Sequence, residues 1–389
     1  MTPTGFNAEA ATQAYIDSLG PEVLEQAAGY TTVHHWFMIG SLLVGGVTAW
    51  LIVRMGWLSA IERRFGQRPN AGVFVIGLVY VLASAALTVP WRIGGWWFAS
   101  PYNRFDDTLG DFLSGLVWEA VFNVVVAPGL LVLLYLFIRK VGKAWWVWGG
   151  ALGAGAISLQ MLLMPIYIMP MFYEYEPLPD GEVRDAVEII AMEADIPTDR
   201  IYVFDGSSQT SNFNAEVGGI GPSARLAISD VAFGEVSLDE VKSVTAHEVG
   251  HYVLGHIWYR IALVSVMSVL LFFLAARIFP GVASLFGAHP DIARASGLPV
   301  LVLIASMLTA AANPIFNTAS RWDNIEADQY SLDTVGLPDA MAAALVNRVE
   351  YRNPRPQGWE EALFYTNPSV ERRVRMAMEW KAENMAEGE

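Results

Sequence analysis

The sequence predicts a mainly α-helical protein: a polytopic membrane helix bundle of about six spans, with a small α+β module between spans four and five, completed by C-terminal helices. Hydrophobic residues make up 54% of the 389 residues and the mean hydropathy is +0.37, more than a water-soluble core of this size requires. Charged residues are only 16% of the chain and gather in a few segments. The long apolar runs that remain are typical of segments that lie in a bilayer.

The N-terminal segment 1–33 is expected to form amphipathic helices that lie against the bundle or at the membrane interface. It is polar, has no basic stretch ahead of the first apolar run and shows no small-residue cleavage site, so it does not resemble a signal peptide. The apolar residues that suggest the amphipathic pattern are Ala14, Tyr15, Leu19, Val23 and Leu24.

Six stretches approach the roughly 20 apolar residues needed to cross a hydrocarbon core. Four lie in 34–170 and two lie in 257–316; their predicted bounds are 36–53, 72–90, 116–138, 145–169, 257–279 and 298–315. Tryptophans near their ends are typical of an aromatic belt. Glu119 and Asn123 in the third span are expected to face a wet cavity or to make a structural contact between helices. Prolines 128, 165 and 170 are expected at bends or ends of spans.

The segment 171–256 has the composition of a water-soluble α+β module. It predicts a helix at 182–194, strands at 201–204 and 226–228, and an edge strand and turn in the Gly-rich segment 214–221. Ser237 followed by Glu240 is a capping-box pattern, so a helix is expected to begin there and to run through His251. The tail 317–389 is charged and predicted to be helical, with a turn at 354–356.

Composition also excludes several kinds of function. The net charge of -15 argues against a nucleic-acid partner, because phosphate binding needs clustered Lys and Arg. The chain has no cysteine, which excludes disulfides, thiolate metal ligands and a cysteine nucleophile. A metal ion would therefore have to be held by His, Asp, Glu or Asn.

The string His247-Glu248-Val249-Gly250-His251 predicts a metal site. On a helix both imidazoles share one face and can bind one Zn²⁺ ion, while Glu248 projects beside it. Zinc would lower the pKa of a water molecule and polarise a carbonyl, and Glu248 would move the proton to a leaving amine, which is peptide-bond hydrolysis. The alternative is a helix with two histidines on a polar face. His256 is five residues further along, has rotated off that face, and is expected to be structural.

The chain resembles the type I CaaX prenyl proteases, integral membrane zinc metalloproteases of the gluzincin type. The similarity extends from about residue 175 to residue 375 and is looser in the spans. A series of motifs in order carries it: Asn214-Ala215 with Gly219, Arg225 to Asp230, Asp239-Glu240, the zinc motif, Asn317, Ser320-Arg321, Ala327-Asp328, Pro368-Ser369 and Arg373.

The resemblance implies a zincin-like protease module and a third zinc ligand three residues before Ala327-Asp328, where the family has Glu and this chain has Asn324. It also implies a His before Pro-Ser that helps to stabilise the oxyanion, where this chain has Asn367. A neutral amide oxygen can bind zinc but lacks the charge of a carboxylate. Asp323 and Glu326 lie about 100° and 200° around a helix from Asn324, whereas Asp328 shares its face. The resemblance implies that Asp328 orients a zinc-binding histidine, and it could keep that role or move inward to compensate for Asn324.

The resemblance further implies that the edge strand binds substrate as an added strand and that Asn214 donates a hydrogen bond to the oxyanion. The alternative is an ordinary Gly-rich hairpin. Arg373 is either a site residue facing the metal-binding helix or an exposed helix arginine. The residues expected to bind substrate are Asn214, Ala215, Glu216, Val217 and Gly218.

The leading functional hypothesis is a membrane zinc endopeptidase acting on peptides, membrane-associated proteins or prenylated-type substrates. The second is an impaired relative that binds peptide or lipidated segments without efficient cleavage, its Asn324 and Asn367 being natural or introduced. A transporter that uses Glu119 as a proton site ranks last, because it leaves the zinc motif unexplained.

Two arguments disagree about sidedness. Basic residues after the first and third spans favour a cytoplasmic position for those loops, which would place the protease module outside. The resemblance implies a cytoplasmic-facing module, and this is the orientation we expect. The basic residues are Arg54, Arg63, Arg64, Arg68, Arg139, Lys140 and Lys143.

Overall fold

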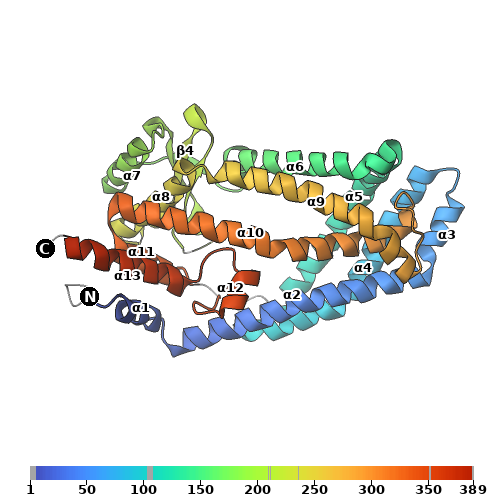
Figure 1. Cartoon of the computed structure of the whole chain (residues 1–389), viewed down its shortest axis with the longest axis horizontal. Coiled ribbons are helices and arrows are strands. Elements are labelled where there is room, and N and C mark those ends of the chain that lie inside the picture. The colour runs from blue at the N-terminus through green and yellow to red at the C-terminus, as the bar shows by residue number, and fades with distance from the viewer. Residues whose placement is uncertain are drawn as a thin grey trace. The chain divides into compact units, whose positions relative to one another are not determined.

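The computed structural model describes residues 6–102, 108–208, 210, 212–234, 236–349 and 352–387 (Figure 1). The chain divides into two compact units, each built from segments that are distant in the sequence. The first unit comprises Met1–Ala28, Gly155–Val264 and Pro314–Glu389, and the second comprises Gly29–Ala154 and Ser265–Asn313. Most described residues are helical, so the predicted fold class is confirmed.

Within the described residues, five helical stretches are long and apolar enough to cross a membrane. All six predicted spans lie inside them, because the third and fourth share one stretch, in which the 3-10 turn Gly142–Ala144 separates two helices. The stretches are Pro21–Met55, Pro69–Ala99, Leu109–Met171, His256–Phe286 and Ala295–Val335.

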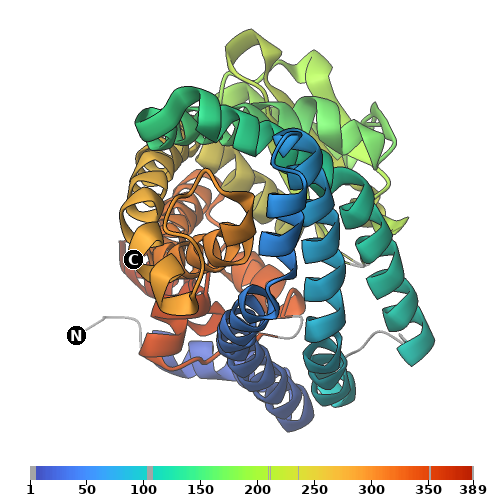
Figure 2. The same cartoon turned by 90° about the vertical axis from the view of Figure 1, so that its right-hand side faces the viewer.

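Helices of the second unit pack closely where small residues allow it. Figure 2 shows helices α4 and α5 side by side, and a Cβ atom added at Gly77 of α4 would lie only 3.1 Å from the Cα atom of Pro128 in α5. Glu119 of α5 forms an ion pair with Arg92 of α4 at 2.7 Å, so this intramembrane carboxylate makes a contact between helices. The helices that contribute to this unit are α2 (Pro21–Met55), α3 (Trp57–Arg64), α4 (Pro69–Ala99), α5 (Leu109–Val141), α6 (Trp145–Leu163), α9 (His256–Phe286) and α10 (Leu298–Val335).

Helix bounds differ from the predicted spans at two places. Helix α2 begins at Pro21, so part of the segment expected ahead of the first span belongs to the same helix. Helix α10 continues unbroken from Leu298 to Val335, although Pro314 lies inside it. The apolar part of α10 and its polar part, which carries the predicted third ligand, are therefore one helix.

The first unit contains a four-stranded sheet of order β1-β2-β4-β3. Strand β2 runs parallel to β4, whereas β1 and β3 are antiparallel to their neighbours. The strands are β1 (Tyr175–Pro177), β2 (Ile201–Phe204), β3 (Ala215–Gly218) and β4 (Arg225–Ser229). Three of them match predicted strands and β3 lies at an edge as predicted, whereas β1 was not foreseen because its three residues have no apolar alternation.

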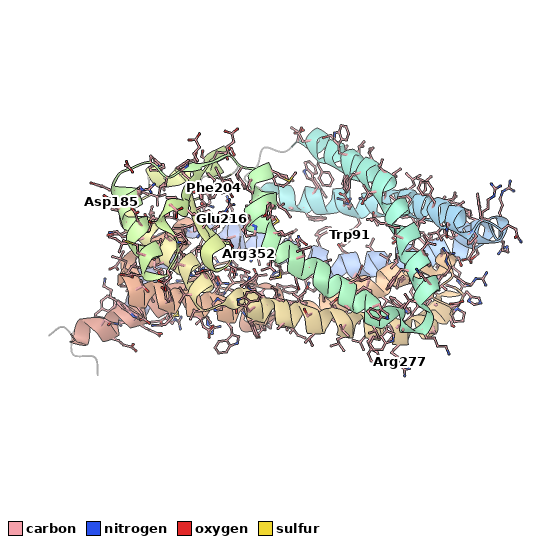
Figure 3. The ribbon with its side chains drawn as sticks, turned by 90° about the horizontal axis from the view of Figure 1, so that it is seen from above. Trp91, Asp185, Phe204, Glu216, Arg277 and Arg352 are labelled. Atoms are coloured by element: carbon pink, nitrogen blue, oxygen red, sulfur yellow. The ribbon has the colours of Figure 1, made fainter. Side chains whose placement is uncertain are left out.

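The core of the first unit lies between this sheet and helices α7 (Glu182–Glu193) and α8 (Leu238–Val253). Because side chains alternate along a strand, Ala215 and Val217 of β3 face this core, and Glu216 and Gly218 face the other side of the sheet. Figure 3 shows Glu216 on the sheet in the region of Phe204 of β2.

The remaining helices of the first unit form a second apolar cluster. Helix α1 (Ala8–Asp17) packs against α13 (Val370–Glu387), which also contacts α11 (Pro338–Asn347). Helix α12 (Gly358–Phe364) precedes α13, and the turn expected at 354–356 lies before α12. The buried side chains of this cluster include Ile16, Leu332, Met341, Val374 and Met378.

Candidate metal centre and active site

The start of α8 is held in place by the predicted capping box. The Ser237 hydroxyl accepts a hydrogen bond from the Glu240 N–H at 3.2 Å, and the Glu240 carboxylate accepts one from the Ser237 N–H at 3.0 Å. The second carboxylate oxygen of Glu240 accepts a hydrogen bond from Asn347 of α11 at 2.9 Å. The helix that carries His247, Glu248 and His251 therefore begins at a defined residue.

Small residues bring α8 against α10 at the level of the motif. A Cβ atom added at Gly250 would lie 3.2 Å from the Cα atom of Ala327, which is itself fully buried. One turn away, the Ser331 hydroxyl donates to the Ser243 carbonyl at 2.8 Å. Larger side chains at these positions would separate the histidines from the acidic segment of α10.

His247 is held by a carboxylate that is itself held by an arginine. Its Nδ1 atom lies 2.7 Å from Oδ1 of Asp328, the residue expected to orient a metal-binding histidine. Asp328 is fully buried and accepts two hydrogen bonds from the Arg373 guanidinium, at 2.7 and 2.6 Å. Arg373 is therefore in contact with the site and is not the exposed helix arginine of the alternative hypothesis. Burial alone would lower the pKa of Arg373, but the Asp328 carboxylate beside it raises that pKa overall.

His251 contacts His256, and this corrects the expectation that His256 has rotated away. That expectation assumed one continuous helix, but α8 ends at Val253 and Gly255 adopts a φ of +69°, so the chain turns before α9 begins at His256. The Nδ1 atoms of His251 and His256 lie 2.7 Å apart, and Nε2 of His256 lies 3.1 Å from Oε2 of Glu326. The Leu254-Gly255 pair was the sequence signal for this turn.

The two imidazoles of the motif lie close together. Their ring centroids are 4.9 Å apart at an interplanar angle of 89°. Burial, with the nearby His247, His256 and Arg260, lowers the pKa of His251 to about 2, so its ring is neutral at neutral pH. Because the Nδ1 atom of each ring faces a neighbouring side chain, Nε2 is the nitrogen that each has left for a metal.

Asn324 supplies an amide at the third position. Its Nδ2 donates to the Ser320 carbonyl at 2.7 Å, which leaves Oδ1 as the atom available to an ion. Asp323 and Glu326 are engaged elsewhere, with Arg260 at 2.5 Å and with His256. Accordingly, the described residues contain no group of three His, Cys, Asp or Glu side chains that could hold a metal. Two imidazole nitrogens and one amide oxygen still fit the N/O donor set of zinc, with one charge fewer than a carboxylate would give.

A cavity of about 540 Å³ opens beside these residues. Glu248, His251, Asn324 and Asn367 line its polar part. The ends of α6 and β3 and the residues that follow them contribute Met161, Leu162, Met164, Pro165, Val217, Gly218, Gly219 and Ile220, and the lining also includes Tyr252, His256, Ile257, Arg260 and Ser320. The predicted general base therefore faces a space that can hold a peptide segment.

The position of Asn367 depends on α10. Arg321 of α10 donates hydrogen bonds to the carbonyls of Glu361 and Tyr365, at 2.8 and 2.6 Å. Asn317, one turn earlier, donates to the Leu363 carbonyl at 2.7 Å. These bonds satisfy carbonyls at the end of α12 and anchor the loop that carries Asn367 into the cavity lining.

The edge strand reaches the cavity at one end only. Val217 and Gly218 belong to the cavity lining, whereas Ala215 is buried in the core. Asn214 precedes the strand and is exposed; its N–H donates to Ser229 Oγ at 3.0 Å, and its Oδ1 accepts from Arg348 at 3.1 Å. Of the five residues expected to bind substrate, the structure thus brings two to the cavity.

Glu216 is held in a mostly buried polar cluster on the outer side of the sheet. The Tyr175 hydroxyl donates to its carboxylate at 2.7 Å, and Arg225 lies 3.8 Å away. Burial raises the pKa of Glu216, although the Tyr175 hydrogen bond and Arg225 oppose this. The folded state therefore binds the proton of the Glu216 carboxyl group more tightly than the unfolded state does. This protonation contributes fully to folding stability below the ordinary pKa of 4.5, and the contribution is lost as pH rises through the raised pKa.

Replacing Glu216 with Gln is therefore expected to stabilise the protein at neutral and alkaline pH. The amide keeps an acceptor for Tyr175 but carries no charge to bury. Each unit by which folding raises the pKa of Glu216 corresponds to about 1.4 kcal/mol of unfolding free energy. The measurement is the thermal unfolding midpoint in detergent at pH 5 and pH 8. The gain should be larger at pH 8, whereas Glu176→Gln at an exposed neighbouring position should show no such difference. An equal midpoint for Glu216→Gln and the unsubstituted protein at pH 8 would contradict the burial argument.

Comparisons with known proteins identify the family and the fold. The model of peptidase family M48 matches residues 177–381, and the model described as CAAX prenyl protease N-terminal, five membrane helices, matches residues 7–174. The crystal structure of Ste24p from S. mikatae has a TM-score of 0.71 with this chain, at 20% sequence identity, and the match covers 95% of this chain and 94% of that one.

Curated metalloproteases and CAAX prenyl proteases are similar to this chain in sequence. The uncharacterized metalloprotease YhfN of Bacillus subtilis is 28% identical over 306 residues, which is 77% of this chain and 69% of the relative. The CAAX prenyl protease 1 homolog of Oryza sativa is 27% identical over 284 residues, 69% of this chain and 64% of the relative. CAAX prenyl protease 1 of Saccharomyces cerevisiae is 29% identical over 206 residues, 49% of this chain and 45% of the relative.

The two family models together cover nearly the whole chain, and the M48 model includes every candidate catalytic and metal-binding residue. The apolar helical stretches agree with the membrane domain that the second model describes. The chain therefore belongs to peptidase family M48, as an integral membrane metalloprotease of the CAAX prenyl protease type.

Proposed function

We propose that the protein is a membrane-embedded zinc endopeptidase, with one Zn²⁺ ion held by His247, His251 and Asn324. The observation that carries the proposal is the shared cavity: Glu248, His251 and Asn324 line the same space as the end of the β3 edge strand. A base, two donors for a metal and a surface for an extended peptide therefore meet at one place.

When bound, zinc would polarise the scissile carbonyl and lower the pKa of a water molecule. Glu248 would accept a proton from that water and deliver it to the leaving amine, which requires a carboxylate that faces the cavity. His247 and His251 would present neutral Nε2 atoms, in orientations set by the groups on their Nδ1 atoms. Arg373 would act through Asp328 rather than on the substrate.

Substrate binding is proposed to use the edge of the sheet. Strand β3 pairs with β4 along one edge, and its end reaches the cavity, so an extended peptide can add as a further strand there. The Asn367 amide in the cavity lining is proposed to donate to the oxyanion. Asn214 is proposed to contact the substrate at the start of β3, outside the cavity that Glu248 lines.

Membrane-associated or prenylated-type peptides are the proposed substrates. The named activity of the CAAX prenyl protease relatives supports this class, as does the apolar wall of the cavity. Asn324 and Asn367 favour a second candidate, a catalytically impaired relative that binds such segments without efficient cleavage. The two candidates differ in whether the bound peptide is cleaved, and not in whether it is bound.

Metal analysis combined with a cleavage assay tests the proposal. Purified protein in detergent is expected to contain about one zinc per chain and to cleave quenched-fluorescent peptides, both farnesylated and unmodified. Removal of zinc by a chelator should abolish cleavage, and zinc addition should restore it. Peptide binding without cleavage, with or without zinc, would favour the impaired relative, and the absence of both zinc binding and peptide binding would exclude both candidates.

We also propose that the protease module faces the cytoplasm. Proteolysis of sealed inverted vesicles, in which the cytoplasmic face is outside, should then cleave the loop at the exposed Asn214. Right-side-out spheroplasts should protect this loop. The reverse pattern would place the module outside, as the distribution of basic residues suggests.

A further inference from the structure

We propose that His256 and Glu326 are positioning residues that orient His251 and select its metal-binding tautomer. This inference rests on the proposed zinc site and deepens it. It is carried by a row of contacts that the motif alone does not contain: His251 Nδ1 to His256 Nδ1 at 2.7 Å, and His256 Nε2 to Glu326 Oε2 at 3.1 Å.

The protons in this row can be assigned from donor and acceptor chemistry. We assign the Glu326 carboxylate as the acceptor of the contact with His256, so that Nε2 of His256 carries the hydrogen between them. The Nδ1 atom of His256 is then the lone-pair acceptor, and the hydrogen between the two Nδ1 atoms belongs to His251. With its proton on Nδ1, His251 presents the Nε2 lone pair, which is the form that binds a metal.

The contacts on His251 orient its ring as the Asp328 contact orients His247, but they involve two residues instead of one. Asp328 lies directly against His247, whereas the row on His251 places an imidazole between the ring and the carboxylate. His256 is only 6% exposed and lines the cavity beside His251, while the Glu326 side chain is 58% exposed. The Glu326 carboxylate thus lies near the surface, and the His256 ring connects it to His251 through two polar contacts.

The local chain geometry is what makes this row possible. Gly255 at φ +69° ends the helical phase of α8 and brings His256 back toward His251. On α10, Glu326 lies two residues after Asn324, so its side chain leaves the helix in a different direction and reaches His256 while Asn324 lines the cavity.

Zinc affinity, measured by competition with a chromogenic chelator, tests the inference. His256→Leu removes the acceptor and is expected to weaken zinc binding about 10-fold to 100-fold. His256→Asn places an amide oxygen near the former Nδ1 atom and should recover part of this loss. Glu326→Leu should also weaken binding, whereas Glu326→Gln, which keeps an acceptor, should weaken it less.

His289→Leu is the matched control, because His289 accepts a hydrogen bond from the Asp291 N–H at 3.1 Å in the second unit. Its zinc affinity should equal that of the unsubstituted protein. The unfolding midpoints of the zinc-free variants separate positioning from packing: a structural role would lower the midpoints of both His256 variants and leave zinc affinity unchanged.

Two results would overturn the inference while the proposed function stands: zinc affinity of His256→Leu equal to that of the unsubstituted protein, or His256→Asn binding no better than His256→Leu. Failure of the unsubstituted protein to bind zinc would instead overturn the proposed function, and this inference with it.

Discussion

Replacing Glu248 with Gln is expected to reduce peptide cleavage by about 10²-fold to 10⁴-fold while zinc still binds. Glu248 lines the cavity beside His251 and Asn324, where it is the carboxylate of the motif. Gln has nearly the same shape but cannot accept a proton from water, so only the chemical step loses its base. The measurement is kcat and KM on a peptide that the unsubstituted protein cleaves, with zinc content determined on the same sample.

The expected loss lies in kcat, because the base acts in the transition state and contributes little to substrate binding. Glu193→Gln, at an exposed position near the end of α7, is the control for the charge change and should leave both constants unchanged. Retention of cleavage by Glu248→Gln would rule out Glu248 as the base. Loss of zinc from the same variant would mean that the carboxylate binds the metal instead.

Replacing Asn324 with Glu is expected to tighten zinc binding by about tenfold or more, which corresponds to about 1.4 kcal/mol. The position is only 8% exposed, so a negative charge placed there acts on the ion with little screening by solvent. The Oδ1 atom of Asn324 is free of the Ser320 contact, and the Glu carboxylate extends one methylene further from the helix, so it brings a charged oxygen toward the ion. Chelator competition gives the affinity.

Asn324→Gln is the matched variant, because it lengthens the side chain by the same methylene without adding charge. If charge is what the site lacks, Glu should exceed Gln, and cleavage at low zinc should rise with occupancy. Equal affinities for Asn324→Glu and the unsubstituted protein would mean that the amide is not a ligand or that another group supplies the charge. Equal gains in zinc affinity from Asn324→Glu and Asn324→Gln would mean that the longer side chain, and not the charge, strengthens zinc binding.

Local patterns determined much of the fold. The spans follow from runs of apolar residues that no water-soluble fold of this composition would need, and the start of α8 follows from Ser237 and Glu240, which act within four residues. Strands β2, β3 and β4 follow from short apolar segments between turn residues. These features depend on neighbours in the chain, so they can be inferred without knowing the tertiary structure.

Part of the candidate site could also be predicted from residues that are close together in the sequence. The spacing of His247, Glu248 and His251 and the face shared by Asn324 and Asp328 are properties of single helices. The resemblance supplied the expectation that Asp328 lies near a histidine. It did not indicate that Arg373 would form two hydrogen bonds to Asp328, because the two residues are on different helices that meet only after folding.

The sequence by itself thus determined a membrane helix bundle, an α+β module and a two-histidine motif on a capped helix. Only the tertiary structure decided which side chains surround that motif. It brought His256 back to His251 through the turn at Gly255, and it left Asn214 outside the cavity lining. The physical reason is that helical phase is lost at a residue with positive φ, and contacts between helices depend on close packing, as at Gly250 and Ala327.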